Sequence, residues 1–511
     1  MNHESLTALG ERVAAVNDVL NAISCLTWDS RTMMPPGGAE TRGRQIATLT
    51  GLARDLLLAP ETEAALEAAE RALESLSPEA LAPDAPERRI VAQTRQAFAY
   101  HRRIPGHLVT ERAALRTVAQ AAWIDARARS DFPAFAPYLE KTVALARSYA
   151  NAVGFTDHPY DAMVAVYEPG ETAASLRRLF AGLRIGLRYI LDQARARPAP
   201  RADFLVRDCA EAEQRVFGLA IAEAMGYDFA RGRLDTTVHP FEVSFTRNDV
   251  RITTRYNRRY LPASIFGTAH ETGHGLYEQG VDPAYTRTTL ATDLVGLYAV
   301  GGTSFGAHES QSRLFENHVA RSPTFWAVHF PALQKAFPDA LSDVTADEFY
   351  RAVTRVEPGF IRVEADELTY DFHIMLRVEI ECALMDGSLS VSDLPEAWNA
   401  VLRRDLDLVV PDDAHGVLQD VHWSSGTIGS FASYTIGNVM AAQVMDALRG
   451  EDPSLDASLA AGAYAPLADK LRERIWQHGR RFSREELLVR TTGRGLDPEP
   501  YLAYLHGKYV G

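Results

Sequence analysis

The chain has 511 residues, 46% of them hydrophobic, and a formal net charge of −14 at pH 7. It is long enough to bury a large core, whereas its negative charge argues against nucleic acid as a partner. No stretch approaches the length of a membrane span, and residues 1–20 lack the basic and apolar regions of a secretory signal. The three scattered cysteines predict free thiols rather than a disulfide framework. We therefore expect a cytoplasmic protein that binds neither nucleic acid nor membrane.

Helical periodicity dominates the sequence. Apolar residues recur at three- and four-residue spacing in residues 5–25, 40–75, 89–127, 134–153, 172–195, 310–320, 346–357, 361–386, 394–410, 434–449 and 501–509. Strand-like sequence is clearest in residues 241–256, which are rich in β-branched and aromatic residues. The sequence therefore predicts a mainly α protein with one small β-sheet, whose edge could hold an extended peptide.

Residues 270–274 read His-Glu-Thr-Gly-His, which is the pattern of half a zinc site. On a helix, His270 and His274 lie four residues apart on one face, so both can bind the same ion. Glu271 lies about 100° further round the turn. It can therefore act on a metal-bound water without being a ligand itself.

The residues around this motif predict a helix with a small-residue surface. No proline interrupts the segment, and Gly280 followed by Pro283 marks its end. Gly273 and Gly275 are poor helix formers, so one interpretation is a weak helix whose histidines bond to backbone carbonyls. The other interpretation, which we favour, is that another segment or a substrate approaches closely beside the second histidine.

A catalytic zinc ion usually takes three protein ligands and leaves one position for water. Glu278 continues the predicted helix but lies a turn too far to complete a tetrahedron with His270. Asp293 follows His274 by 19 residues, a spacing close to that of other zinc peptidases. Glu309 follows His274 by 35 residues and begins a second predicted helix. Spacing alone leaves the choice between Asp293 and Glu309 nearly even.

Five blocks of sequence follow one another along the chain. They are His239-Pro240-Phe241, Asp-Val-Arg-Ile-Thr at 249–253, the motif at 270–274, His-Glu-Ser-Gln-Ser-Arg at 308–313 and Ile-Arg-Val-Glu-Ala-Asp at 361–366. In this order they resemble the thermostable carboxypeptidase Taq family of zinc metallocarboxypeptidases. Residues 28–38, 419–423 and 497–509 also read like family sequence, so the resemblance covers nearly the whole chain.

The resemblance implies that Glu309 is the third ligand and that Asp293 is not. It implies one zinc ion per chain, which cobalt can often replace, and peptide substrates with a free C-terminus. It also implies a single all-helical domain over residues 1–511 with a deep groove, and usually a homodimer. Within this domain we expect an N-terminal helical part (1–200), a catalytic core (201–450) and a C-terminal helical part (451–511).

Two features depart from the family pattern. The segment Val281–Ala307 is longer than expected, and its Gly301-Gly302 pair suggests a hinge in an inserted loop. Ser430 stands where relatives typically carry a tyrosine, whereas Tyr434 remains. We expect these departures to affect the range of substrates and not the metal site.

The hypothesis for the chemistry is hydrolysis by metal-activated water. A zinc ion lowers the pKa of a bound water toward neutrality. Glu271 is the candidate general base, which accepts the proton and delivers it to the departing amine. Tyr434 or His422 is the candidate donor to the developing oxyanion.

A carboxypeptidase must also recognise a terminal carboxylate, which a guanidinium group does by bidentate pairing. Arg362 is the leading candidate because it lies in the block at 361–366. The competing interpretation of Arg362 is an ordinary helix-surface pair with Asp366, four residues further on. Arg251, on the predicted strand, is the alternative candidate for binding the terminal carboxylate. His239 is a further candidate for hydrogen bonding to substrate or to a metal ligand.

Four other residues are candidates for supporting roles. Asp249 either supports a metal ligand, positions Arg251 or is a turn residue. His308 either supports a metal ligand or packs in the core. Asp366 and Glu367 are candidate carboxylate partners for the zinc histidines.

The leading hypothesis is therefore a zinc carboxypeptidase. An oligopeptidase or endopeptidase in the same groove is a second enzyme hypothesis. A non-catalytic peptide-binding protein on a decayed scaffold is a third hypothesis. The joint presence of both histidines, Glu271 and Glu309 argues against decay, because a binding module needs no general base.

Overall fold

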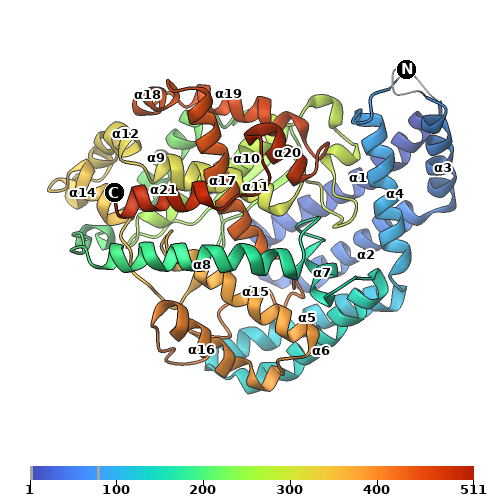
Figure 1. Ribbon diagram of the computed structural model, residues 1–511, viewed down its shortest axis with the longest axis horizontal. Coiled ribbons are helices and arrows are strands. Elements are labelled where there is room, and N and C mark those ends of the chain that lie inside the picture. Colours follow the sequence, from blue (N-terminus) through green and yellow to red (C-terminus); the bar gives the residue numbers. More distant parts are fainter. Residues whose placement is uncertain (1–3, 77–80) are drawn as a thin grey trace. The chain divides into compact units, whose positions relative to one another are not determined.

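The computed structural model describes residues 4–76 and 81–511, and most of them are helical (Figure 1). The chain forms two compact units, each built from separate stretches of sequence. The first unit takes residues 1–102, 200–353 and 441–496, and the second takes residues 103–199, 354–440 and 497–511. The predicted mainly α fold is confirmed. Among the helices of the described residues, none combines the length and the low polarity that a membrane span needs.

The first unit carries helices from all three of its stretches. They are α1 (Glu4–Thr32), α2 (Ala39–Leu58), α3 (Pro60–Glu74), α4 (Pro86–Arg103), α9 (Glu211–Ala224), α10 (Pro262–Gly280), α11 (Phe305–Arg313), α12 (Pro323–Ala336), α13 (Pro338–Leu341), α14 (Ala346–Val353), α18 (Leu455–Ala460), α19 (Ala465–Arg474) and α20 (Arg484–Thr492). A π-helix, η5 (Leu314–Ala320), follows α11 directly. Single 3-10 turns are η1 (Pro36–Gly38), η2 (Asp203–Val206), η3 (Pro283–Tyr285), η4 (Thr289–Ala291) and η8 (Trp476–His478).

The second unit is entirely helical within the described residues. Its elements are α5 (Gly106–Arg129), α6 (Phe132–Val153), α7 (Pro159–Val164), α8 (Ala173–Arg195), η6 (Arg362–Glu364), α15 (Tyr370–Asp386), η7 (Val391–Asp393), α16 (Leu394–Leu406) and α21 (Glu499–Tyr509). Helix α17 (Ala432–Glu451) contributes to both units. The C-terminal helix α21 packs along α8 (Figure 1).

One small sheet lies in the first unit, beside the helix that carries the His-Glu-Thr-Gly-His motif. Its strands are β1 (Gly232–Thr236), β2 (Glu242–Thr246) and β3 (Asp249–Thr254), in the order β1-β3-β2. β3 pairs with β1 in parallel and with β2 in antiparallel orientation, and α10 packs against β3 and β2. The predicted strand segment 241–256 is confirmed as β2 and β3. Because β3 is central, only β1 and β2 have an outer edge.

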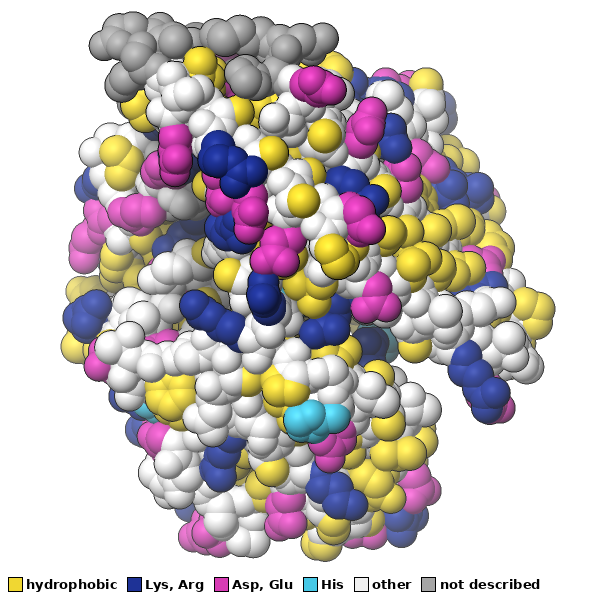
Figure 2. Space-filling model, turned by 90° about the vertical axis from the view of Figure 1, so that its right-hand side faces the viewer, with side chains coloured by type: hydrophobic (Ala, Val, Ile, Leu, Met, Phe, Trp, Pro, Cys, Tyr) yellow, Lys and Arg dark blue, Asp and Glu magenta, His cyan; other side chains and the backbone are white. Residues whose placement is uncertain are grey.

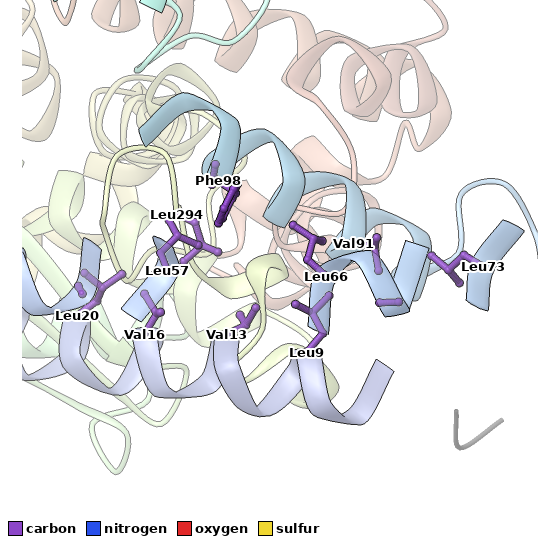
Figure 3. Packing of buried hydrophobic residues seen from close by; sticks show 13 residues of the cluster. Leu9, Val13, Val16, Leu20, Leu57, Leu66, Leu73, Val91, Phe98 and Leu294 are labelled. Atoms are coloured by element: carbon purple, nitrogen blue, oxygen red, sulfur yellow. The ribbon is translucent and has the colours of Figure 1, made fainter. Parts of the chain in front are cut away.

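A hydrophobic core ties the N-terminal helices of the first unit together (Figure 3). Leu9, Val13, Val16 and Leu20 follow one another at four- and three-residue spacing, so they form one stripe along α1. This stripe packs against buried residues of α2, α3 and α4 and against Leu294. Truncating such a buried leucine to alanine typically costs about 2–5 kcal/mol.

Charged side chains of both signs lie next to one another on the surface drawn in Figure 2. Many charged side chains of the described residues form exposed ion pairs, such as Arg44 with Glu40 and Arg129 with Asp125, each at 2.6 Å. Exposed pairs of this kind contribute about 0–1 kcal/mol each. They therefore add little to the stability that the core supplies.

Proline breaks two of the predicted helices. The predicted helix over residues 40–75 is wrong as a single element, because Ala59 takes an extended conformation before Pro60 and separates α2 from α3. The predicted helix over residues 89–127 divides in the same way at Pro105, between α4 and α5.

The predicted helix over residues 361–386 is wrong in its first part. Residues 362–364 form the 3-10 turn η6, and α15 begins only at Tyr370. Oδ1 of Asp366 accepts hydrogen bonds from the backbone N–H groups of residues 368 and 369, both at 3.0 Å. Such local bonds compete with a helix. Arg362 and Asp366 are therefore not a helix-surface pair.

Candidate metal centre

Helix α10 carries the motif, and its glycines let two neighbouring elements approach closely. A Cβ atom on Gly273 would lie 2.3 Å from the carbonyl oxygen of Gln311 and 2.6 Å from Cα of Ser312, both on α11. A Cβ atom on Gly275 would lie 2.7 Å from the ring of Tyr227. The expectation of a close approach beside the second histidine is confirmed, and the approaching segment is α11.

Replacing Gly273 with alanine should therefore separate α10 from α11. The added methyl group meets backbone rather than a flexible side chain, and overpacking of this kind costs about 1–3 kcal/mol. We expect Gly273→Ala to lower both the free energy of unfolding and the affinity for zinc. Gly182→Ala on α8 is the matched control, because nothing lies within 4 Å of that position. Equal unfolding and zinc affinity in the two variants would contradict the close packing.

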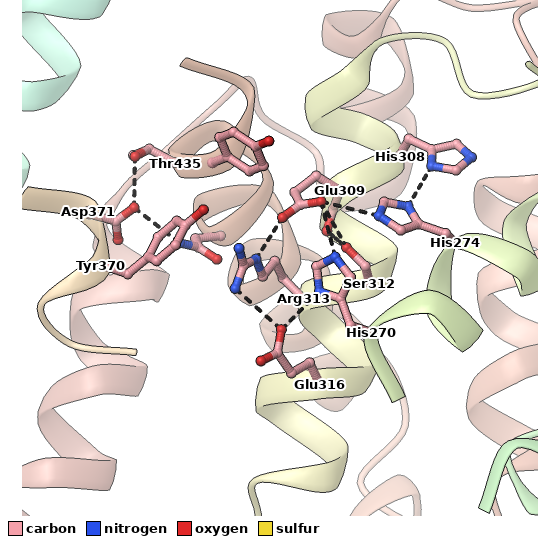
Figure 4. Close-up of polar contacts among 12 residues, drawn as sticks. His270, His274, His308, Glu309, Ser312, Arg313, Glu316, Tyr370, Asp371 and Thr435 are labelled. Atoms are coloured by element: carbon pink, nitrogen blue, oxygen red, sulfur yellow. Dashed lines mark hydrogen bonds and ion pairs between the residues drawn. The ribbon is translucent and has the colours of Figure 1, made fainter. Parts of the chain in front are cut away.

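His270, His274 and Glu309 bring three donor atoms together (Figure 4). Nε2 of His274 lies 3.2 Å from Oε2 of Glu309, and Nε2 of His270 lies 3.6 Å from the same oxygen. One donor atom from each residue lies within 4.8 Å of the others. Two imidazole nitrogens and a carboxylate oxygen are a donor set that suits a catalytic zinc ion. The three residues therefore form a candidate metal site.

Asp293, the alternative third ligand, is engaged elsewhere. Its Oδ1 accepts hydrogen bonds from the backbone N–H groups of Val295 (3.0 Å) and Gly296 (3.1 Å). The guanidinium group of Arg480 lies 3.4 Å from the same carboxylate. The candidate metal site includes Glu309 and not Asp293, in agreement with what the family resemblance implies.

Glu271 lies in the same buried region and is only 4% exposed. Its Oε2 has no hydrogen-bond partner among the described residues. Burial raises the pKa of Glu271 to about 8, against the opposing charge of His270. A buried carboxylate oxygen without a partner is the feature expected where a bound water or substrate completes the site. The residues present therefore fit a metal ion with an adjacent general base.

The Nδ1 atom of each imidazole ring contacts a neighbouring side chain. Nδ1 of His270 lies 2.9 Å from Oε2 of Glu316, on η5. Nδ1 of His274 lies 2.5 Å from Nδ1 of His308. The supporting role considered for His308 thus agrees with its position, whereas the sequence analysis missed Glu316. Its spacing of seven residues from Glu309 places both on one helical face and could have revealed it.

Asp366 and Glu367, the candidate partners of the histidines, bind within the second unit. Asp366 accepts from the backbone at residues 368 and 369. Glu367 accepts from Lys508 at 2.7 Å and from two tyrosines of α21. The imidazole rings of His270 and His274 direct Nε2 at Glu309 and Nδ1 at other side chains. Neither ring therefore has a nitrogen left for Asp366 or Glu367.

Arginines keep two buried carboxylates beside the site, those of Glu309 and Glu316, ionised. Nε of Arg313 donates to Oε1 of Glu309 at 2.7 Å, and its Nη1 lies 3.3 Å from Glu316. Although burial opposes ionisation, Arg313 and the imidazoles hold the pKa of Glu309 well below its usual range. Arg313 and Arg321 do the same for the pKa of Glu316. Burial lowers the pKa of His274 to about 3, which favours the neutral ring that a metal ligand must be.

The strand residues form their own cluster in the first unit. Arg251 pairs with Asp249 through two bonds of 2.9 Å. Its guanidinium group lies 4.6 Å from the ring centres of both Trp28 and Phe245. Asp249 thus pairs with Arg251, as one of its three interpretations predicts, and both of its carboxylate oxygens accept from that arginine. His239 is exposed on the connection between β1 and β2.

Arg362 belongs to a buried cluster in the second unit. Its Nε and Nη2 donate to Oδ1 of Asp420 at 3.0 and 2.8 Å, and its Nη1 donates to the hydroxyl of Tyr370. Nε of Arg377 donates to Oδ2 of the same aspartate at 2.6 Å. The two arginine side chains are 7% and 0% exposed. One carboxylate thus serves two buried guanidinium groups, and one positive charge stays in excess.

Both candidate oxyanion donors lie beside this arginine. The hydroxyl of Tyr434 lies 3.5 Å from Nε2 of His422. The guanidinium group of Arg362 lies 5.2 Å from the ring centre of Tyr434. Ser430, where the family resemblance leads us to expect a tyrosine in relatives, donates to the carbonyl oxygen of Thr427 at 2.8 Å.

Replacing Asp420 with asparagine should destabilise the protein by about 3–5 kcal/mol, because two buried guanidinium groups lose their counter-charge. Against burial, Arg362 and Arg377 hold the pKa of Asp420 far below its ordinary value of 3.8. The aspartate therefore contributes stability above about pH 4, and this contribution is lost as the pH falls through the pKa of the folded state. Urea unfolding at pH 7 and at pH 3 measures both effects.

The matched control for this prediction is Asp407→Asn. Asp407 pairs on the surface with Arg188 at 2.9 Å and with Arg195 at 3.4 Å, where the loss of each ion pair costs at most about 1 kcal/mol. Its backbone has a φ of 60°, which asparagine tolerates. Equal destabilisation of the two variants would contradict the special role of the buried cluster.

Comparison with known proteins gives a consistent result. The family model described as Carboxypeptidase Taq (M32) metallopeptidase matches residues 8–509. The chain is 41% identical over 493 residues to thermostable carboxypeptidase 1 of Thermus thermophilus, covering 94% of both chains. It is 35% identical to carboxypeptidase 1 of Bacillus subtilis, covering 96% of this chain and 94% of that protein. The crystal structure of an M32 carboxypeptidase from Deinococcus radiodurans R1 aligns with a TM-score of 0.93 and 40% identity over 99% of both chains.

Proposed function

Because the chain belongs to the carboxypeptidase Taq (M32) family and is a metallocarboxypeptidase, we propose that it removes C-terminal residues from peptides at a zinc site. The ligands are His270, His274 and Glu309, with one ion per chain, and cobalt is the substitute ion. The observation that carries the proposal is the convergence of these donors beside Glu271, whose buried oxygen has no partner among the described residues.

Different residues carry out different steps of the proposed peptide hydrolysis. The ion, when bound, supplies a Lewis acid and an acidified water. Glu271 follows a ligand directly in sequence, so α10 fixes its carboxylate relative to the donors. The carboxylate accepts a proton during attack on the scissile carbonyl and passes it to the departing amine. Tyr434 or His422 donates a hydrogen bond to the developing oxyanion.

We assign recognition of the substrate carboxylate to Arg362. Its bonds to Asp420 and Tyr370 use three of its five N–H groups, so two remain for a ligand. The excess positive charge of the cluster favours an anion. Arg251 is a weaker candidate, because Asp249 already pairs with it in bidentate fashion. His239 stays a prediction for hydrogen bonding to substrate.

An N-blocked peptide with a free C-terminus tests the proposed activity against its own C-terminal amide. A carboxypeptidase cleaves the free acid and releases its last residue, whereas an oligopeptidase or endopeptidase cleaves both peptides at internal bonds. Zinc-loaded protein should show the first pattern. Failure to cleave either peptide with zinc or cobalt bound would overturn the proposal.

Replacing Arg362 with lysine should raise the KM for the free acid by about 10- to 100-fold. Lysine keeps the charge but loses the planar fork, and a charge-assisted bond contributes about 1.5–3 kcal/mol. Arg251→Lys, which changes the rival candidate in the same way, is the matched control and should stay within a few-fold of wild type. The reverse pattern would assign recognition of the substrate carboxylate to Arg251.

The homodimer, the deep groove, the division of the domain and the cytoplasmic location stay predictions.

A further inference from the structure

A third histidine connects the metal ligand His274 to a buried carboxylate (Figure 4 shows its first link). Nδ1 of His308 lies 2.5 Å from Nδ1 of His274. Nε2 of His308 lies 2.8 Å from Oε1 of Glu278, whose side chain is only 5% exposed. The chain of contacts from the ligand to the carboxylate is therefore continuous.

The valence of the two rings fixes the direction of these hydrogen bonds. When His274 offers the lone pair of Nε2 to an ion, a neutral ring must carry its proton on Nδ1. Nδ1 of His308 must then accept that proton's hydrogen bond, so the proton of His308 sits on Nε2. Nε2 of His308 in turn needs an acceptor, and Glu278 is the group that faces it. An acceptor at Glu278 is thus required for the metal-binding form of His274.

Backbone groups hold the Glu278 carboxylate in the accepting position. The N–H of Gly301 donates to its Oε1 and Oε2 at 2.9 and 3.0 Å, and the N–H of Gly302 donates to Oε1 at 3.2 Å. A Cβ atom on Gly302 would lie 2.5 Å from the ring of His308. The glycine pair, expected to be a hinge, is therefore a fixed point of this network.

Ring stacking holds His308 in the same orientation. Its ring centre lies 4.6 Å from that of His274 with an interplanar angle of 22°, and 5.3 Å from that of Tyr277 with an angle of 16°. Three aromatic rings thus lie nearly parallel. His308 cannot turn away from His274 without losing both stacking contacts.

From these contacts we infer that Glu278, acting through His308, is a positioning residue for the metal ligand His274. It keeps the lone pair of Nε2 directed at the ion. The inference rests on the proposed metal site and extends it to a carboxylate that is not itself a ligand. Partners of this kind typically contribute 10- to 100-fold to metal affinity.

The affinity of the full-length protein for Zn²⁺, measured by competition with a chelator, tests the inference without turnover. His308→Phe keeps a stacked ring but leaves Nδ1 of His274 without an acceptor. We expect its affinity for zinc to fall by about 10- to 100-fold. His308→Asn places an oxygen near the position of Nδ1 and should recover part of that loss. Tyr277→Phe, which changes only the stacked neighbour, is the matched control and should bind zinc as wild type does.

A second pair of variants tests the carboxylate. Glu278→Ala removes the acceptor and should weaken zinc binding, whereas Glu278→Gln keeps an oxygen for His308 and should recover most of the affinity. In a double-mutant cycle, Glu278→Ala should add little once residue 308 is phenylalanine, because the effect of Glu278 passes through that ring. If Glu278→Ala does not fold, the two His308 variants carry the test alone.

Two results would overturn the inference: wild-type zinc affinity in folded His308→Phe, or additive losses in the double-mutant cycle. A wild-type protein that binds no zinc would instead overturn the proposed function. The two failures are therefore distinguishable in the same titration.

Discussion

Glu271→Gln should abolish peptide cleavage while the protein still binds zinc. Glutamine has nearly the same shape, but it cannot accept a proton from the attacking water. Because positioned acids and bases contribute about 10²- to 10⁴-fold, we expect kcat to fall by a factor in that range. The measurement is release of the C-terminal residue from a blocked peptide, together with the zinc content of the same sample.

Glu223→Gln on α9 is the control for Glu271→Gln. It makes the same chemical change at an exposed position of the first unit and should leave both activity and zinc content unchanged. A Glu271→Gln protein that cleaves at the wild-type rate with zinc bound would remove Glu271 from the mechanism. A variant without zinc would place Glu271 among the ligands.

Glu309→Gln should remove the metal and the activity together. An amide oxygen is a weaker and uncharged ligand, and Arg313, which pairs with Glu309 at 2.7 Å and with Glu316 at 3.3 Å, would lose one of its two counter-charges inside the site. We expect zinc affinity to fall by at least about 100-fold, since even partners that only support a ligand contribute 10- to 100-fold. Chelator competition measures the affinity, and the blocked peptide measures the activity.

Asp293→Asn is the matched control for Glu309→Gln, because Asp293 is the ligand that sequence spacing could not exclude. Asparagine keeps the oxygen that accepts from Val295 and Gly296, so the local turn should survive. Zinc binding and activity should stay at the wild-type level. Loss of zinc in Asp293→Asn with retention in Glu309→Gln would reverse the assignment of the third ligand.

The sequence predicts the parts of the site that local periodicity controls. His270, Glu271 and His274 lie within one helical turn or a little more, so helical spacing alone fixes their relation. The same periodicity predicts most helices, but it cannot show where a proline such as Pro60 or Pro105 divides one.

Local periodicity does not predict which helices, distant in the sequence, pack against each other. The position of Glu309 beside the histidines depends on the contact of α11 with Gly273, which the spacing of 35 residues does not encode. Glu316 lies on a π-helix, a rare element that occurs frequently at functional sites. Within the sequence, only the family resemblance favoured Glu309 over Asp293 as the third ligand.

Arg362 shows how local spacing can support a wrong alternative. Its spacing of four residues from Asp366 fitted a surface pair on a helix, but local hydrogen bonds of Asp366 end the helical pattern there. The partner of Arg362 is Asp420, 58 residues away in the sequence. Burial and a distant counter-charge, rather than local spacing, decide the environment of this arginine.

Because Glu278 binds the backbone of Gly301 and Gly302, the alignment of α10 and α11 does not depend on the length of the loop between them. Glu278 lies near the end of α10, and the glycine pair lies just before the start of α11. These hydrogen bonds hold the two ends of the intervening stretch together. Residues added or removed between these two ends therefore do not change the position of α11 against α10. The greater length that we predict for 281–307 is thus compatible with an undisturbed set of donor atoms.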